Sequence, residues 1–113
     1  MNLTQEDMIM ENNSDAVLNG VLEKIARGYS NAKSDWSADR MNPFKDGKFL
    51  GYYEAKEAIM KVLNAEGPVA AAVDEIKRRY NTVKNDWLAD KMNPFKDGRF
   101  LAYFEVLNLL PTT

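Results

Sequence analysis

The sequence predicts an all-α protein, a four-helix bundle made of two tandem helical hairpins that are related by a pseudo-twofold axis. The chain repeats itself at an offset of 51 residues, and 17 of the 26 positions aligned between residues 29–54 and 80–105 are identical. Within each copy, apolar residues recur at spacings of four and three, which is typical of an amphipathic helix. The segment MNPFKDG occurs at both 41–47 and 92–98 and carries the Pro and Gly of a tight connection.

An apolar stripe predicts the first helix of each repeat. In repeat 1 the stripe consists of Leu18, Leu22, Ile25, Tyr29, Ala32 and Trp36, and in repeat 2 of Val69, Val73, Ile76, Tyr80, Val83 and Trp87. We therefore expect long helices over residues 15–41 and 68–91, with Ser14 as the first N-cap. The aromatic members of both stripes are expected in the core. These core aromatics are Trp36, Trp87, Tyr29 and Tyr80.

Two shorter helices are expected over residues 48–65 and 99–110, each following a connector. One stripe of these helices is small, which would allow a neighbouring helix to come close. It consists of Gly47, Gly51, Ala55 and Ala58 in repeat 1, and of Gly98, Ala102 and Val106 in repeat 2. Gly67 suits a helix C′ position and Pro68 the next helix start, so the repeats divide into 14–66 and 67–113. Together they form one helical domain.

The connector is interpreted as a structural joint between two helices. Pro43 and Pro94 disfavour helical backbone at the preceding Asn, which can then cap a new turn. Gly47 and Gly98 are expected to adopt a positive φ. Phe44 and Phe95 are expected to fold back onto their own hairpins, buried or half-buried.

Asp39 and Asp90 occupy the next step of the apolar stripes and are predicted to be loop anchors. A carboxylate facing a core needs a partner, and the connector offers backbone N–H groups and basic side chains. Asp35 precedes Asp39 by one helical turn, and Asp86 precedes Asp90 in the same way, so a carboxylate cation site is an alternative. The nearby Lys and Arg residues argue against it, and no metal is predicted.

Composition restricts the chemistry available to the chain. It has 113 residues, no Cys and no His, so thiolate chemistry and the commonest general base and zinc ligand are excluded. No phosphate loop, nucleophile–base pair or metal cluster occurs, so we expect no catalytic residue and no cofactor. No apolar run could span a bilayer and no signal peptide is recognisable, which predicts a cytoplasmic protein with no membrane partner.

Residues 1–13 read as an acidic N-terminal tail. The formal net charge of the chain is −2. Residues 1–15 contribute −4 to it, so the remaining residues together carry +2. Such a mild positive charge does not indicate a nucleic-acid-binding protein. Met8, Ile9 and Met10 could cover an apolar groove expected where the last helix stops short, near Leu110. The chain is predicted to be a monomer or a weak homodimer.

The function predicted first is a small, non-catalytic protein-interaction module with a protein partner. Its candidate binding residues are the loop tips and flanks of the two connectors. They are Phe44, Lys45, Asp46, Lys48, Phe95, Lys96, Asp97 and Arg99. Tyr53 with Glu54, and Phe104 with Glu105, are further surface candidates.

Two alternatives come from other functional classes. Basic residues of both repeats, interleaved with aromatic ones, could present two faces to a nucleic-acid duplex. Acidic residues on different helices, with Asp35 and Asp39 as the first cluster, could form a metal-dependent carboxylate enzyme, but Glu57 of the weak second cluster is replaced by Asn108 in repeat 2.

The string Gly-Arg-x-x-Ala-Tyr-x-Glu-Val-Leu at residues 98–107 resembles the last helix of small uncharacterised helical proteins of bacterial, phage and mobile-element genomes. It is carried by Gly98, Arg99, Ala102, Tyr103, Glu105, Val106 and Leu107. The resemblance implies an accessory factor that binds a host protein, and it implies no catalytic residues. The tandem duplication departs from the single-unit pattern of that group.

Overall fold

The computed structural model describes the backbone of residues 5–111 and the side chains of residues 15–111. It contains four helices: α1 (Gln5–Ala38), α2 (Pro43–Asn64), α3 (Val69–Leu88) and α4 (Pro94–Leu109). Between residues 5 and 111 no strand occurs. The predicted all-α, four-helix architecture is therefore confirmed.

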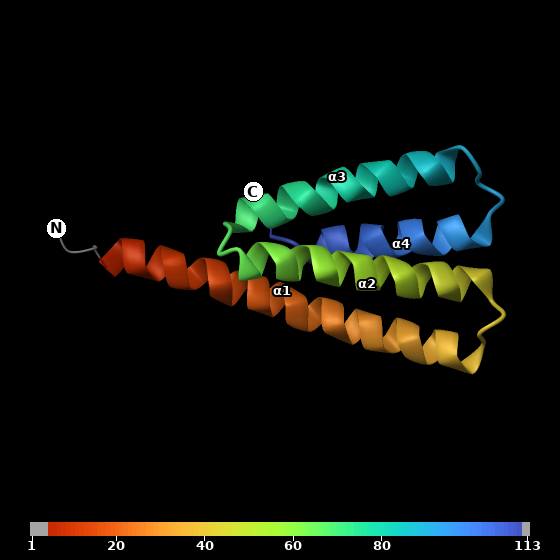
Figure 1. The fold of residues 1–113 in the computed structure, drawn as a ribbon, viewed down its shortest axis with the longest axis horizontal. Coiled ribbons are helices and arrows are strands. Elements are labelled where there is room, and N and C mark those ends of the chain that lie inside the picture. Colours follow the sequence, from red (N-terminus) through yellow and green to blue (C-terminus); the bar gives the residue numbers. More distant parts are fainter. Residues whose placement is uncertain (1–4, 112–113) are drawn as a thin grey trace.

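The two hairpins lie side by side with both connectors at the same end of the molecule (Figure 1). Helices α2 and α4 occupy the middle and share the most extensive helix contact, while α1 covers α2 and α3 covers α4. Because both connectors lie at one end, α2 and α4 run parallel. The first turns of α1 extend beyond the bundle (Figure 1), which contributes to the long dimension of 59 Å.

The contact between α2 and α4 is made by their backbones. A Cβ atom added to Gly47 would lie 1.9 Å from the carbonyl oxygen of Phe95, and one added to Gly98 would lie 2.0 Å from that of Phe44. One turn later, a Cβ on Gly51 would lie 2.6 Å from the Cβ of Ala102. These reciprocal contacts obey the 51-residue offset, so they place the pseudo-twofold axis between the two helices. The close approach predicted from the small stripe is confirmed.

The positive φ predicted for Gly47 and Gly98 is wrong. No glycine of the described chain has a positive φ, and both residues lie inside helices, just after the first turns of α2 and α4. The Asn42 side chain accepts hydrogen bonds from the N–H groups of Phe44 and Lys45, and the Asn93 side chain caps α4 by accepting one from Lys96. Because these caps start α2 and α4 at the prolines, the predicted starts at 48 and 99 were several residues late.

The N-terminal segment is helical from Gln5, so Ser14 lies inside α1 and is not its N-cap. The segment predicted as an acidic tail over 1–13 is helical in its backbone from residue 5, where it continues into the rest of α1. The side chains of Met8, Ile9 and Met10 lie outside the described residues. Near the C-terminus, two residues of the expected apolar groove are buried, because Leu110 is only 9% exposed and Ile59 is fully buried.

The core lies between the four helices and includes two aromatic residues, Tyr52 and Tyr103, which are 6% and 1% exposed. The four predicted core aromatics lie at the edge of this core instead. Trp36, Trp87, Tyr29 and Tyr80 are all half-buried. Helices α1 and α3 each cover one side of the central pair, so their stripes are enclosed less completely. The burial predicted for both tryptophans is thus wrong.

A Schellman motif ends α2 and positions the turn into α3. Gly67 donates its N–H to the carbonyl of Val62 (2.8 Å), and Glu66 donates to Leu63 (3.0 Å). The left-handed residue of the motif is Glu66, with φ of 58°, and not the Gly67 that the sequence suggested.

We predict that Glu66→Gly will stabilise the protein by about 0.5–1 kcal/mol, because a left-handed conformation strains any residue with a Cβ. Chemical denaturation of the variant and the parent measures this difference. Glu57→Gly, in the interior of the same helix, is the control and is expected to destabilise by about 1 kcal/mol. A loss of stability in Glu66→Gly would contradict the assignment of the motif.

Candidate interaction surface

A glutamate of repeat 1 holds two side chains of repeat 2 beside the α2–α4 contact. Glu54 accepts hydrogen bonds from Arg99 Nε (2.8 Å) and Arg99 Nη2 (2.9 Å), which is a bidentate ion pair. The hydroxyl of Tyr103 lies 3.5 Å from the same carboxylate. Burial, and then the charge of Glu54, raise the pKa of Tyr103, so its phenol stays protonated and can donate.

A glutamate of repeat 2 makes the reciprocal contacts. Glu105 accepts a hydrogen bond from the hydroxyl of Tyr52 (3.0 Å) and pairs with Lys48 Nζ (3.4 Å). Burial, and then Glu105, raise the pKa of Tyr52. We call these two arrangements the crossed clamps: Glu54 with Arg99 and Tyr103, and Glu105 with Lys48 and Tyr52. Each clamp joins the two repeats.

The crossed clamps give two predicted binding residues, Lys48 and Arg99, an internal role. Sequence reasoning placed them at exposed loop flanks and missed both tyrosines as their partners. The signal was present, because a basic residue, Tyr four positions later and Glu two positions after that recur at the same offset in both repeats. The predicted surface residues Glu54 and Glu105 are likewise part of the clamps.

The loop anchors Asp39 and Asp90 contact their own connectors. Asp39 accepts from the Asn42 amide (3.3 Å) and pairs with Lys45 (3.6 Å). Asp90 likewise accepts from Asn93 (3.3 Å), and Lys96 pairs with both Asp90 and Asp86. Both anchors were expected to face the core, but both are exposed, because α1 and α3 end before them. Each is therefore worth about 1 kcal/mol or less.

The carboxylates near the connectors do not assemble a metal site within the described part of the chain. No group of three or more acidic side chains there is arranged to hold a metal ion. Asp86 is occupied by Lys96, and Asp97 accepts a hydrogen bond from the indole Nε1 of Trp87. The cation site considered for Asp35 and Asp39 thus has no third carboxylate ligand among residues 15–111.

Aromatic rings line the outer flank of each hairpin. Trp36 stacks on Phe49 with ring centroids 4.9 Å apart, and Trp87 stacks on Phe100 at 4.5 Å. A cation lies over each indole. Arg40 is 5.0 Å from the Trp36 ring and Lys91 is 5.5 Å from the Trp87 ring. The half-buried tryptophans therefore form a surface layer in both repeats.

In repeat 2 this flank opens into a hollow that we call the aromatic groove. It is lined by Phe44, Tyr80, Lys84, Trp87, Asp97, Phe100, Leu101 and Phe104. Phe44 belongs to the connector of repeat 1, so packing of the hairpins completes the groove. Two of the predicted binding residues, Phe44 and Asp97, are brought together here. Phe44 is 37% exposed, slightly more than the half-buried position expected of it, and it lines the aromatic groove of repeat 2 although it was expected to fold back onto its own hairpin.

The matching flank of repeat 1 carries different side chains at two of the corresponding positions. Tyr53 lies over Tyr29 with ring centroids 6.4 Å apart, and Lys56 lies 5.1 Å from the Tyr29 ring. In repeat 2 the corresponding positions are Phe104 and Leu107. Phe104 lines the groove and is 44% exposed. The two repeats therefore share one framework and differ in this surface.

The remaining predicted binding residues lie near the connector end. Phe95 is half-buried, as expected, and Asp46 lies in the first turn of α2. The most exposed apolar side chains at this end are Met41 and Met92, at 92% and 91%. Sequence reasoning did not select them. The available signal was that both are apolar residues without a place in either helical stripe.

Comparison with protein-family models, with curated proteins and with solved structures finds no match to this chain. Among the helices described, none is both long enough and apolar enough to cross a membrane.

The crossed clamps predict energetic coupling between the repeats. We expect a double-mutant cycle on Glu54→Gln and Arg99→Gln to give a coupling of about 0.5–1.5 kcal/mol, because the pair is bidentate and partly buried. Denaturant unfolding of the four proteins measures it. The control cycle combines Glu54→Gln with Lys48→Gln, which belong to different clamps, and should give nearly zero. Equal values in both cycles would contradict the clamp geometry.

Proposed function

We propose that this protein is a non-catalytic interaction module that binds another protein through the aromatic groove. The observation that carries the proposal is the exposure of Phe104 and Phe44 beside the stacked Trp87 and Phe100. Large aromatic side chains dominate binding energy at protein interfaces, especially where they form a concave patch. The groove therefore has the composition expected of an interface.

Rigidity of the groove supports the same proposal. Trp87 is fixed by its stacking on Phe100 and by its hydrogen bond to Asp97, and Tyr80 lies 5.6 Å from the Phe100 ring. Side chains held in this manner lose little conformational entropy when a partner binds. The chemistry of the groove suits an apolar or aromatic anchor of the partner, with Lys84 at the groove available to an acidic group.

The nucleic-acid alternative has less support. Several of the cations on which it rests form ion pairs within the molecule. Lys45 pairs with Asp39, Lys96 with Asp86 and Asp90, Lys48 with Glu105, and Arg99 with Glu54. Phosphate contacts require cations that can exchange counterions for the backbone. We therefore place protein binding first, in a cytoplasmic accessory factor of the kind that the resemblance of residues 98–107 implies.

The repeat supplies a matched control for the test. Phe104→Ser removes an aromatic ring of the groove, and Tyr53→Ser removes the corresponding, equally exposed ring of repeat 1. Both variants should remain folded, because both positions lie on the outer faces of their helices. Peptides are first selected for binding to the parent protein, and their dissociation constants are then measured for the parent and the two variants.

We expect selected peptides to bind about tenfold or more weakly to Phe104→Ser, which corresponds to the loss of about 1.4 kcal/mol, and to bind Tyr53→Ser like the parent. Apolar or aromatic residues should predominate at the anchor position of the selected sequences. If the two variants weaken binding equally, or if the selected peptides bind elsewhere, the groove is not the interface.

A further inference from the structure

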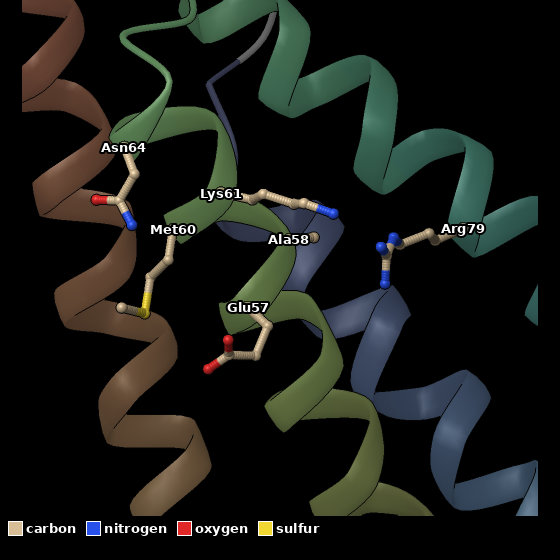
Figure 2. A pocket seen from close by; sticks show the side chains of 6 residues that line it. All are labelled: Glu57, Ala58, Met60, Lys61, Asn64 and Arg79. Carbon is tan, nitrogen blue, oxygen red and sulfur yellow. The ribbon is translucent and has the colours of Figure 1, made fainter.

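A second hollow lies between α2 of repeat 1 and α3 of repeat 2, and it is shown in Figure 2. It has a volume of about 330 Å³ and is lined by Glu57, Ala58, Met60, Lys61, Asn64 and Arg79. Lys61 comes from the last turn of α2 and Arg79 from α3. Figure 2 shows their charged ends pointing toward one another across Ala58, whereas the Glu57 carboxylate points away. The small side chain of Ala58 leaves the space between the two cations open.

The charges around this hollow do not balance. Arg79 Nε donates to Glu75 (2.7 Å), and Arg78 Nη2 donates to the same carboxylate oxygen (2.6 Å). These hydrogen bonds lower the pKa of Glu75 to about 2, so it is already fully ionised and cannot supply further negative charge. One carboxylate therefore serves two guanidinium groups, and Lys61 adds a third positive charge. Over this group of five side chains, Glu57 included, three positive charges are balanced by only two negative ones. Lys61, Arg79 and Glu57 line the hollow, whereas Arg78 and Glu75 lie beside it.

Arg79 also lines another, smaller hollow. That hollow has a volume of about 180 Å³ and is lined by Arg78, Arg79, Thr82, Val83, Arg99 and Tyr103. Arg79 is only partly buried. Because 33% of its side chain is exposed, solvent can reach the guanidinium group. Guanidinium and ammonium groups at such sites are the usual protein ligands of phosphate oxygens.

The two repeats differ sharply at this point. The counterpart of Arg79 in repeat 1 is Gly28, where an added Cβ would lie 2.4 Å from the ring of Tyr52. In repeat 1 the tyrosine ring therefore packs against backbone. In repeat 2 the same position carries a cation beside Tyr103, and Lys61 of α2 completes the pair. The pair formed by Lys61 and Arg79 therefore has no counterpart at Gly28 in repeat 1.

We propose that Lys61 and Arg79 form a binding site for a phosphate-class oxyanion, either inorganic phosphate or the phosphate group of a small monoester. The oxyanion would accept hydrogen bonds from both side chains and offset the excess positive charge. A tetrahedral phosphate fits within the hollow, and the remaining volume beside Met60 and Asn64 can hold part of an ester substituent. This site is separate from the aromatic groove and does not depend on the proposed function.

The test uses ¹H–¹⁵N NMR of the full chain, titrated with sodium phosphate at constant pH and ionic strength. We expect saturable shifts at the amides of residues 58–61 and 79. Arg79→Gln and Lys61→Gln should each weaken binding about tenfold, the loss expected for a charge-assisted hydrogen bond. Arg27→Gln removes a cation of repeat 1 at the counterpart of Arg78 and should leave the affinity within about twofold.

A second arm replaces inorganic phosphate with phenyl phosphate. Tighter binding with added shifts at residues 60 and 64 would identify a monoester as the ligand, and equal binding would identify the free anion. Lys61 is exposed, so Lys61→Gln remains informative if Arg79→Gln perturbs folding. Shifts that rise linearly without saturation in the parent protein, or equal weakening by Arg27→Gln, would overturn the proposal.

Discussion

The approach of α2 to α4 through Gly47 and Gly98 is the constraint on which the rest of the structure depends. Each glycine lies against the carbonyl oxygen of a phenylalanine in the opposite connector, at a separation that leaves no space for a Cβ. Two helices that meet backbone to backbone fix their relative position more tightly than two helices separated by large side chains. The identical connectors are therefore a structural joint, because each must provide a glycine to the other.

The consequences of this contact extend outward from the central pair. It brings the crossed clamps within reach of each other's repeat, so Glu54 and Glu105 each bind a cation and a tyrosine from the opposite hairpin. It also carries Phe44 across the axis to the flank of repeat 2, where the aromatic groove forms. Helices α1 and α3 then cover the outer sides, which leaves the aromatic residues of their stripes half-buried.

The sequence predicts the architecture well because its evidence is periodic. The 51-residue offset, the matched stripes and the small residues of α2 and α4 each lead to two hairpins packed about a twofold axis. The Asn and Pro of each connector likewise predict the N-caps that the structure contains. These features depend on neighbours within one or two helical turns, which sequence patterns describe directly.

The predictions that fail are those that depend on which helices lie in the middle. The apolar stripes of α1 and α3 were assigned the core aromatics, yet Tyr52 and Tyr103 of the central helices are the buried ones. The sequence predicts Lys48 and Arg99 on the surface, because it does not show that Glu105 and Glu54 of the opposite repeat lie close enough to pair with them. The sequence predicts Gly67 at the C′ position of α2, but Glu66 has the left-handed conformation there. The Schellman hydrogen bonds at the end of α2 place the turn at this residue.

The stability of glycine variants tests the role of the α2–α4 contact most directly. Gly47→Ala and Gly98→Ala each force a Cβ against an opposing carbonyl oxygen, and we expect each to destabilise the protein by about 3 kcal/mol. Gly20→Ala, where nothing lies within 4 Å of the added Cβ, should stabilise it by about 0.5–1 kcal/mol through helix propensity alone. If denaturant unfolding shows that Gly47→Ala and Gly98→Ala behave like Gly20→Ala, the helices do not meet backbone to backbone, and the proposed basis of the fold is wrong.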